Sequence, residues 1–511
     1  MGAPNRETLI ILDFGSQYTQ LIARKARELG VFSLIVPYST RAEEVKHHNP
    51  LGIILSGGPN SVYDKDAPTI DERILKLDIP ILGICYGLQL LSVVFGGKVS
   101  PALSREYGQA EITVTSATRL LKGFNKSTIW MSHGDHVTKL PNGFKTTAKS
   151  NGTICVIEDN KRKIFGFQFH PEVSQTKFGK DMLDNFLRIC GFSKNWSPRE
   201  LITGYVDQIR ESVGSSNVIC ALSGGVDSSV AATLVNRAIG RQQFCIFVDN
   251  GLLRQDEYKD TLLMYKNLGL NIKPVNAKKR FLDKLKNISD PETKRKVIGK
   301  EFIAVFEEEA SKIKNANFLV QGTLYPDIIE SVSVNGPSVT IKSHHNVGGL
   351  PKKMKLKLIE PLKMLFKDEV RQIGSQLGLP TEIVSRQPFP GPGLAVRIIG
   401  EVNKEGVELL QRADAIVRSV IERTKSAKSL YQYFAVLLPI KSVGVMGDKR
   451  SYEQVVAIRA VQSADGMTAN WAHIPHKLME TLSSKIISEV KGVNRVVYDI
   501  TSKPPGPIEW E

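Results

Sequence analysis

The sequence predicts an α/β protein in which two doubly wound parallel-sheet domains are followed by a small α+β domain. First, buried-strand patterns such as residues 9–15 and 52–55 alternate with helical stretches, which is typical of a parallel sheet. Second, the same alternation recurs from Val218 onwards, after a junction near Pro198. Third, a proline–glycine linker at residues 386–394 precedes segments that mix strands with helices.

Length and composition agree with this organisation. A chain of 511 residues suits about three domains, and we expect them at residues 1–195, 196–385 and 386–511. The hydrophobic content of 41% is ordinary for a globular chain, and no run of 18 apolar residues offers a membrane span. Residues 1–7 contain no apolar signal core, so we expect a cytoplasmic protein without a membrane partner.

The net charge and the cysteine content indicate which partners and which kinds of site to expect. The 68 Lys and Arg against 52 Asp and Glu give a formal net charge of +16, which favours anionic partners such as nucleotides and phosphates. Basic residues are frequent in 271–300, where we expect most of them to form a solvated surface. The five cysteines show neither a CxxC pair nor metal-ligand spacing, so we expect reduced thiols and no structural metal.

A cysteine stands at the end of the third predicted strand of the first domain. Residues 81–84 have the pattern of a buried strand, and a helical stretch begins after Cys85. Gly83 and Gly87 leave room for a sharp turn, so this segment has the pattern of a nucleophile elbow. The start of the following helix favours a thiolate. A buried inert cysteine is the common alternative, but it does not explain glycines on both sides.

The base for this nucleophile is predicted at His170, where the strand of residues 164–170 ends. Residues two apart in an extended chain point to the same side, so Glu172 is expected to orient the imidazole. His170 would then activate Cys85.

An oxyanion hole is expected beside this pair. Gly58 follows an earlier strand, and its backbone amide together with that of Tyr86 is the pair of donors that we expect. His133 is a weaker catalytic candidate, and an ordinary loop histidine fits it better.

Three motifs, in this order, resemble those of class I glutamine amidotransferases, and the resemblance covers residues 8–190. The motifs are Ser-Gly-Gly-Pro at 56–59, Gly-Ile-Cys-Tyr-Gly at 83–87 and Phe-Gln-Phe-His-Pro-Glu at 167–172. The resemblance implies that glutamine is hydrolysed through a thioester and that ammonia is released.

The second domain opens with a glycine-rich loop between a buried strand and a helix. Its glycines permit close backbone approach, and the helix start provides unpaired amides, which together suit a phosphate. The loop lacks the lysine of the Walker motif and resembles the pyrophosphate-binding loop of enzymes that split ATP between its α- and β-phosphates. The resemblance implies ATP binding, with Mg²⁺, by Ser223, Gly224, Gly225, Val226, Asp227, Ser228 and Ser229.

Two further strand ends are expected to complete the nucleotide site. The second strand of a nucleotide-binding sheet tends to lie beside the ribose and base, so Val248 and Leu253 are assigned to ATP. Gly322, after the third strand, permits close approach to the nucleotide.

The pyrophosphate and its magnesium are expected to involve Asp227 and two more residues. Asp327 either binds magnesium and polar nucleotide groups or caps a helix after Pro326. Lys367 lies at a predicted helix start and suits a phosphate. The polar, glycine-flanked residues 343–351 are expected to form a lid over the nucleotide.

The remaining segments resemble the GMP synthetase family. They include residues 291–299, the Pro-Phe-Pro-Gly-Pro-Gly linker and the closing residues 498–511, so that the resemblance now covers nearly the whole chain. It implies a C-terminal domain that binds xanthosine monophosphate (XMP) and pairs two subunits. Arginine and lysine suit its phosphate, and a carboxylate accepts from the purine or ribose. The residues assigned to XMP are Arg295, Asp465, Lys503 and Glu509.

Together these resemblances imply a C–N ligase whose substrates are glutamine, ATP and XMP. They imply that glutamine supplies ammonia, that ATP is cleaved to AMP and pyrophosphate through an adenylyl-XMP intermediate, and that GMP is formed. One alternative is another glutamine-dependent ligase with an ATP pyrophosphatase domain, such as an NAD synthetase. That family normally carries a different amidase and lacks the Lys503–Glu509 tail. A nucleic-acid-binding module is a second alternative, prompted by the net charge of +16.

Overall fold

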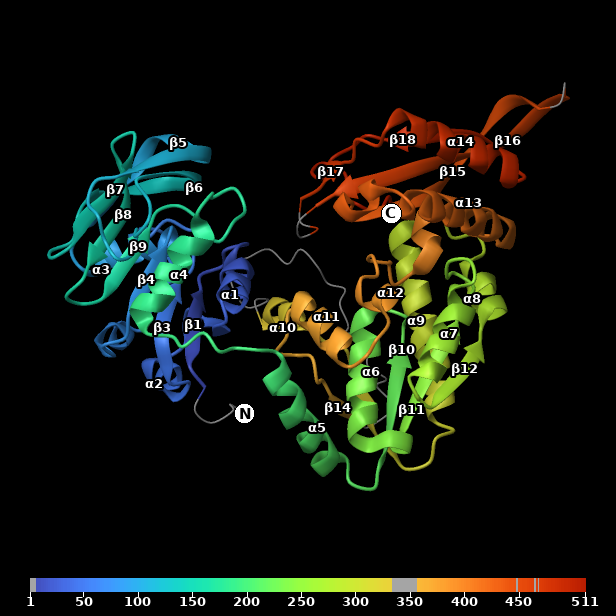
Figure 1. Ribbon diagram of the computed structural model, residues 1–511, viewed down its shortest axis with the longest axis horizontal. Helices are drawn as coiled ribbons and strands as arrows, with labels where there is room; N and C mark the ends of the chain where they lie inside the picture. The colour runs from blue at the N-terminus through green and yellow to red at the C-terminus, as the bar shows by residue number, and fades with distance from the viewer. Residues whose placement is uncertain (1–5, 333–355, 447–448, 464–465, 467) are drawn as a thin grey trace. The chain divides into compact units, whose positions relative to one another are not determined.

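The structure, a computed structural model, describes residues 6–332, 356–446, 449–463, 466 and 468–511. These residues form two compact units (Figure 1). The first unit holds the chain up to Glu200 together with helix α10 (Tyr325–Val332), and the second holds the remaining described residues. Asp465 and the 343–351 segment lie outside the described residues.

The first unit is built on a nine-stranded sheet in the order β2-β1-β3-β4-β9-β8-β7-β5-β6. Strands β2, β1, β3, β4 and β9 run parallel, which confirms the predicted α/β arrangement. Four antiparallel strands, β8, β7, β5 and β6, extend the sheet beyond that prediction. In chain order the strands are β1 (Thr8–Asp13), β2 (Phe32–Pro37), β3 (Pro50–Leu55), β4 (Ile81–Ile84), β5 (Lys98–Val114), β6 (Lys126–Lys139), β7 (Lys145–Ser150), β8 (Thr153–Asp159) and β9 (Ile164–Phe167).

Helices cover both faces of the parallel part of this sheet (Figure 1). Alternate residues of β1 point to opposite faces. Ile10 and Leu12 join one hydrophobic core with α2 and α3, whereas Leu9 faces the side where Cys190 of α4 lies over Gly52. The carboxyl ends of the parallel strands therefore meet at one open edge, where ligands of such sheets bind. The helices are α1 (Thr19–Glu28), α2 (Ala42–His47), the 3₁₀ turn η1 (Glu72–Lys76), α3 (Tyr86–Val94) and α4 (Gly179–Cys190).

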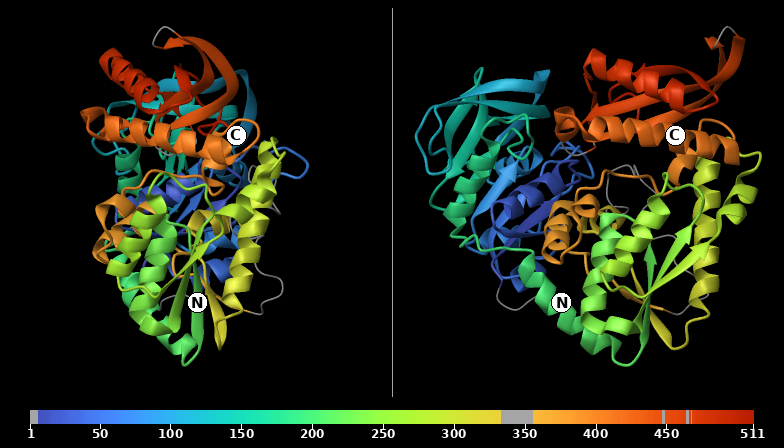
Figure 2. Two further views of the ribbon diagram at one scale, coloured as in Figure 1. Left: turned by 90° about the vertical axis from the view of Figure 1, so that its right-hand side faces the viewer. Right: turned by 45° about the vertical axis from the view of Figure 1, so that its right-hand side comes forward.

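The second unit contains a five-stranded parallel sheet in the order β12-β11-β10-β13-β14, with helices on both faces (Figures 1 and 2). Cys220 of β10 packs towards α6, while its neighbour Ile219 packs towards α8 and α9. This is the doubly wound arrangement that the sequence predicts. The strands are β10 (Asn217–Leu222), β11 (Gln243–Asp249), β12 (Ile272–Asn276), β13 (Ala316–Val320) and β14 (Lys357–Ile359). The helical segments are α5 (Arg199–Val213), α6 (Val226–Ile239), η2 (Gly240–Gln242), α7 (Glu257–Asn267), α8 (Lys278–Leu285), α9 (Pro291–Ala310), α11 (Lys367–Gln376) and α12 (Thr381–Val384).

The same unit carries the smaller sheet of the C-terminal part, formed by β15, β16 and β17 with β18 pairing parallel to β16. One face of this sheet packs on α13 and α14 and shares a continuous core with α8 and α9. Ile508 and Ala469 cover the other face, which explains why the closing segment of the chain is ordered. The elements are η4 (Gly393–Arg397), α13 (Lys404–Glu422), η5 (Lys425–Ser429), β15 (Gln432–Met446), β16 (Lys449–Gln462), β17 (Asn470–Trp471), α14 (His476–Glu489) and β18 (Val493–Asp499). Among the described residues, no helix combines the length and apolar character needed to cross a bilayer.

Candidate active sites

Cys85 occupies a strained turn between β4 and α3. Its φ of 52° and ψ of −104° are conformations that side-chain-bearing residues rarely adopt, and its amide donates to the Phe167 carbonyl at 2.7 Å. Neighbouring positions have no room for a side chain. A Cβ on Gly83 would lie 2.5 Å from the carbonyl carbon of Gly87, and one on Gly87 would lie 2.4 Å from the carbonyl oxygen of Leu55. The backbone thus has the sharp strand–turn–helix geometry of a nucleophile elbow.

His170 and Glu172 lie directly beside this turn. His170 Nδ1 is 2.7 Å from Glu172 Oε1, and both side chains are buried. The imidazole also interacts with the Cys85 thiol, which lies 3.7 Å from the Ser132 carbonyl oxygen. Burial acts to lower the pKa of His170, but the Glu172 charge and the bonds to Cys85 and Glu172 outweigh it and raise that pKa well above its ordinary value. An imidazolium held in this way stabilises a thiolate nucleophile.

We expect Glu172→Gln to lower kcat/KM for glutamine hydrolysis about 10²-fold. Loss of the carboxylate lowers the pKa of His170, and the imidazolium disappears as pH rises through that value. The alkaline limb of the pH profile of kcat/KM therefore moves to lower pH. Glu43→Gln, which removes an exposed carboxylate of the same unit, is the matched control. An unmoved alkaline limb in Glu172→Gln would contradict this role.

A cavity of about 690 Å³ opens at the sulfur of Cys85, and Gly58 and His170 are among its lining residues. Gly58 approaches the backbone closely, since a Cβ there would lie 2.7 Å from the Phe14 carbonyl oxygen. Helix α3 begins at Tyr86, so the Tyr86 amide is one of the helix's first N–H groups and has no intrahelical acceptor. The two amides assigned to the oxyanion hole thus belong to residues that adjoin the nucleophile.

Two further residues of this cavity, His133 and Gln89, differ from what the sequence predicts. The expectation that His133 lies in a loop is wrong, because it is a buried residue of strand β6 and lines the cavity. Gln89 also lines it and donates from Nε2 to the Asp135 carbonyl at 2.8 Å. The spacing indicates this position for Gln89, because it stands four residues after Cys85 and therefore lies on the same face of the helix.

The glycine-rich loop connects β10 to α6 in the second unit. Gly224 has a φ of 79°, which favours glycine, and Gly225 is the N-cap residue of α6. The hydroxyl groups of the loop are used internally. Ser229 Oγ donates to the Gly225 carbonyl at 2.7 Å, and the oxygens of Ser223 and Ser228 are 3.0 Å apart. The loop is therefore held in place with the helix N-terminus exposed to a ligand.

A cavity of about 250 Å³ adjoins this loop and brings together much of the predicted ATP site. The Asp227 carboxylate lies 3.2 Å from the Lys367 ammonium. Gly322 packs against the loop, since a Cβ there would lie 3.3 Å from the Asp227 carbonyl carbon. Predicted residues that line the cavity are Ser223, Gly224, Gly225, Val226, Asp227, Val248, Leu253 and Lys367.

Four predicted residues, Ser228, Ser229, Gly322 and Asp327, do not line this cavity, and Arg386 is among the unpredicted residues that do. Asp327 lies in the first turn of α10, a helix of the first unit. Arg386 lines the cavity and donates from Nη1 to the Gly224 carbonyl at 2.6 Å. Sequence reasoning missed Arg386 because it stands far along the chain from the loop that it contacts.

The described residues assigned to XMP, Arg295, Lys503 and Glu509, belong to the second unit. Lys503 Nζ donates to the Gly466 carbonyl at 2.9 Å, and the Glu509 carboxylate accepts two bonds from Arg397, at 2.9 and 2.8 Å. Arg295 lies on α9 and is 3.9 Å from Glu292. Within the described part of the chain, Arg295 forms no hydrogen bond or ion pair with Lys503 or Glu509.

Lys294 links α9 to the closing segment. Its side chain is fully buried, in contrast to the solvated surface expected for most of its basic run. The ammonium contacts the carbonyls of Ala395 and Ile398, at 3.3 and 2.7 Å, and Glu511 Oε2 at 2.5 Å. Lys294 therefore ties the helix that carries Arg295 to the segment that carries Glu509.

Comparison with known families matches three parts of the chain. The model of the family described as Glutamine amidotransferase class-I matches residues 10–190. The NAD synthase model matches residues 199–301, and the model of the GMP synthase C terminal domain matches residues 419–510.

Relatives that are similar over the full length are named GMP synthase [glutamine-hydrolyzing]. The protein of Brachyspira hyodysenteriae is 56% identical over 511 residues, which is 99% of this chain and 99% of the relative. That of Fusobacterium nucleatum is 54% identical and covers 98% of this chain and 99% of the relative. That of Aquifex aeolicus is 54% identical and covers 99% of this chain and 100% of the relative.

Proposed function

The chain belongs to the family of glutamine-hydrolysing GMP synthases, and from this premise we propose how its residues divide the reaction. It is a C–N ligase that makes GMP with glutamine as the nitrogen donor. We assign glutamine hydrolysis to residues 1–195, ATP cleavage to residues 196–385, and XMP binding and dimer formation to residues 386–511.

The glutaminase half uses Cys85, His170 and Glu172. The sulfur of Cys85 attacks the carboxamide carbon, and the amides of Gly58 and Tyr86 stabilise the oxyanion. The His170 imidazolium gives its proton to the leaving nitrogen, so ammonia departs and a thioester remains. His170 then takes a proton from water, which hydrolyses the thioester to glutamate.

The synthetase half primes XMP with ATP. The loop of residues 223–229 holds the phosphates, and the C2 oxygen of XMP attacks the α-phosphorus while pyrophosphate leaves. Ammonia then attacks C2 of adenylyl-XMP, and AMP departs with the former C2 oxygen. We propose that Arg295, Lys503 and Glu509, with Asp465, hold XMP during both steps.

The residues near the loop suit Mg²⁺. Asp227 Oδ1 is buried and accepts no hydrogen bond from the described residues, while its other oxygen pairs with Lys367. Mg²⁺ is commonly held by one or two carboxylates plus substrate phosphates, which fits this arrangement. Bound there with ATP, the ion would supply positive charge to the departing pyrophosphate. Asp227 would hold it, and Lys367 would contact the phosphates.

The observation that carries this assignment is the presence of both constellations in one chain: the Cys85–His170–Glu172 set, and the glycine-rich loop with its cavity. An assay with XMP, ATP, Mg²⁺ and glutamine, each omitted in turn, tests it. We expect GMP, with AMP and pyrophosphate, only in the complete mixture, whereas glutamate also forms when XMP is omitted. GMP formed without XMP, or ADP in place of AMP, would overturn the assignment.

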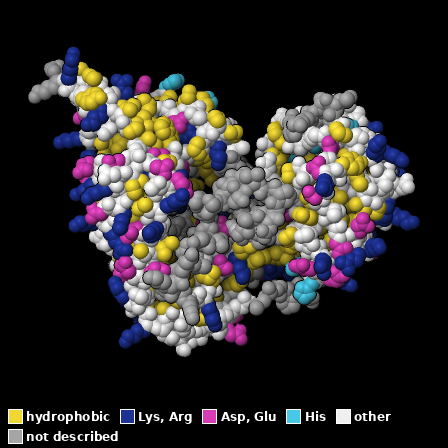
Figure 3. Space-filling model, turned by 180° about the vertical axis from the view of Figure 1, so that it is seen from behind, with side chains coloured by type: hydrophobic (Ala, Val, Ile, Leu, Met, Phe, Trp, Pro, Cys, Tyr) yellow, Lys and Arg dark blue, Asp and Glu magenta, His cyan; other side chains and the backbone are white. Residues whose placement is uncertain are grey.

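We propose that two subunits pair through the hairpin formed by β15 and β16. Val443 and Val445 lie on one face of β15, and Tyr452 is the register partner of Val443 on β16. Their exposed fractions are 60%, 72% and 65%, which is unusual for side chains of this size. Figure 3 shows hydrophobic side chains gathered over the C-terminal part of the chain, at the upper left.

The double substitution Val443→Lys with Val445→Lys is expected to convert a dimer into a monomer, because like charges would face one another across the paired hairpins. Light-scattering mass during gel filtration measures this. Leu263→Lys, on an exposed position of α7, is the matched control and should leave the mass unchanged. A dimeric mass for the double variant would refute pairing through this face.

Two alternatives are less well supported. The NAD synthase model matches the middle of the chain alone, whereas the full-length relatives are GMP synthases. For nucleic acid, the described basic residues of the 271–300 run are largely paired: Lys273, Lys278 and Lys286 contact Glu309, Asp249 and Asp283. Salt-sensitive retention of RNA by the protein on a filter would favour the second alternative.

All five cysteines are free thiols, which supports the cytoplasmic location that we propose.

A further inference from the structure

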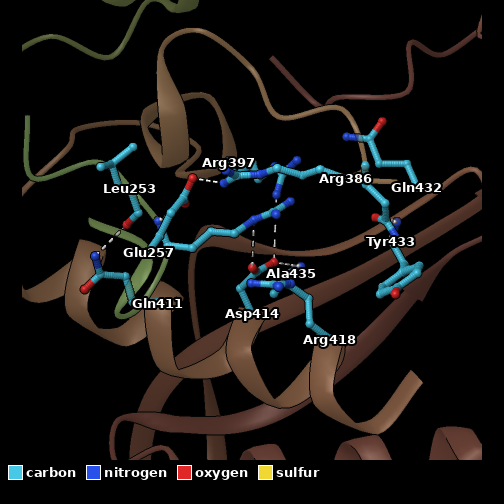
Figure 4. A network of polar contacts seen from close by, with 12 residues as sticks. Leu253, Glu257, Arg386, Arg397, Gln411, Asp414, Arg418, Gln432, Tyr433 and Ala435 are labelled. Atoms are coloured by element: carbon cyan, nitrogen blue, oxygen red, sulfur yellow. Dashed lines mark hydrogen bonds and ion pairs between the residues drawn. The ribbon is translucent and has the colours of Figure 1, made fainter. Parts of the chain in front are cut away.

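A buried network of charges lies between the ATP cavity and the C-terminal sheet, within the second unit (Figure 4). Its central members are Arg254, Arg397 and Asp414, whose exposed fractions are 5%, 0% and 1%. Burial lowers the pKa of Arg254 to about 10, which leaves this residue cationic at neutral pH. Buried charges of this kind are costly, and apolar residues of similar size often give equal or greater stability. Stability alone therefore gives little physical reason for these buried charges.

One side of the network forms part of the wall of the ATP cavity. Leu253 lines that cavity, and its carbonyl accepts a bond from Gln411 Nε2 of α13 at 2.7 Å. The amide of Arg254 donates to Glu257 Oε2 at 2.8 Å. Glu257 pairs with Arg386, which in turn donates to the Gly224 carbonyl of the phosphate loop. The position of Arg254 is thereby connected to the loop that holds pyrophosphate.

The opposite side of the network reaches the closing segment of the chain. Arg397 holds the Glu509 carboxylate with two bonds, and Gln432 Nε2 donates to the same carboxylate at 2.5 Å. Arg397 also stacks on the ring of Phe434, with 4.0 Å between the guanidinium carbon and the ring centroid. Glu509 is one of the residues that we assign to XMP, so this side of the network holds a residue of the XMP site in place.

Asp414 joins the two sides. Its Oδ2 lies 3.6 Å from Arg254 Nε, and its Oδ1 lies 3.8 Å from Arg397 Nη1. Oδ1 also accepts a bond from the Ala435 amide at 3.1 Å, which anchors the carboxylate to strand β15. The ring of Phe389, from the proline–glycine linker, contacts both cations, with 4.5 Å to Arg254 and 5.3 Å to Arg397. One carboxylate thus lies between two guanidinium groups. That of Arg397 holds Glu509, and that of Arg254 belongs to a residue whose amide is linked through Glu257 and Arg386 to the glycine-rich loop.

We propose that Asp414 is a positioning residue for adenylyl transfer. It holds Arg254, on the side of the ATP cavity, and Arg397, on the side of the XMP site, in fixed positions relative to each other. The inference rests on the proposed function, because it assumes that the loop binds ATP and that Glu509 contacts XMP. Transfer requires the C2 oxygen of XMP and the α-phosphorus to lie about 3 to 3.5 Å apart and aligned, and a displacement of about 1 Å can cost about 10²-fold in rate. Asp414 acts through its two arginines and does not itself touch the reacting atoms.

Asp414→Asn tests this role, because it removes the charge and retains an oxygen for the Ala435 amide. The measured reaction is the exchange of labelled pyrophosphate into ATP that depends on XMP, without glutamine or ammonium. We expect the turnover number of exchange to fall about 10²-fold. The KM values for ATP and XMP should each stay within about threefold, because each half-site keeps its own contacts. Glu408→Gln, which removes an exposed charge from the same helix, is the matched control and should exchange at the wild-type rate.

The possible outcomes distinguish a failure of the proposed function from a failure of the positioning role of Asp414. Wild-type protein that shows no XMP-dependent exchange would contradict the proposed function itself. Wild-type exchange together with an unaltered Asp414→Asn variant would overturn only the positioning role, and so would a loss that appears entirely as a raised KM. If Asp414→Asn does not fold, Arg254→Lys keeps the positive charge but loses the planar contact with Asp414 and Phe389. It should lower the turnover number about tenfold with little change in KM, and a wild-type turnover number would again overturn the role.

Discussion

Cys85→Ala is expected to lower glutamine-dependent GMP formation by at least about 10⁴-fold. GMP formation from added ammonium should continue at close to the wild-type rate. The physical reason is that the variant lacks the sulfur that forms the thioester, whereas the ATP cavity belongs to the second unit and is unchanged. Measuring GMP formation with each nitrogen source in turn checks the prediction.

Alanine is the conservative choice for this test because the strained turn accepts a small side chain. Cys155→Ala is the matched control, since it removes another buried thiol of the same unit that lies away from the cavity lining. Equal loss of both activities in Cys85→Ala, with the control active, would show that the two halves are not divided as proposed.

Asp227→Asn is expected to abolish synthesis while sparing glutamine hydrolysis, in contrast to Cys85→Ala. GMP formation should fall about 10³-fold with either nitrogen source, because the charge assigned to Mg²⁺ and pyrophosphate is lost. Hydrolysis of glutamine measured without XMP should persist, since Cys85, His170 and Glu172 lie in the first unit. Parallel assays of AMP release and glutamate release measure the two effects.

The control for this variant is Asp283→Asn, which removes a carboxylate of the same unit that pairs with Lys286 on the surface. It should retain both activities. Wild-type ammonium-dependent synthesis in Asp227→Asn would contradict the assignment of the pyrophosphate site to this loop.

The local parts of the fold and of the candidate sites could be predicted from the sequence. Gly83 and Gly87 flank Cys85 because the turn has no space for side chains, and that requirement is visible in a few adjacent residues. His170 and Glu172 are two residues apart, so their contact follows from extended geometry. The glycine-rich loop is likewise a continuous segment between a strand and a helix.

The long-range parts could not be predicted. Strands β5, β6 and β7 carry many polar residues, because one face of an antiparallel sheet can remain partly exposed, and they lack the continuous apolar runs of buried parallel strands. Lys294 stands within a basic run that suggests a solvated surface, yet Glu511 neutralises it in the core. Asp414 and Arg254 are 160 residues apart in the chain (414 − 254), and nothing near either residue indicates the other.

The central claim is that ammonia made at Cys85 replaces the C2 oxygen of XMP, and that this oxygen leaves on AMP. The most direct measurement supplies XMP labelled with ¹⁸O at C2 and glutamine labelled with ¹⁵N in its amide, and analyses the products by mass spectrometry. The account predicts ¹⁵N in GMP and ¹⁸O in the phosphate of AMP, with pyrophosphate unlabelled. Label from XMP found in pyrophosphate or water, or GMP without ¹⁵N, would contradict it.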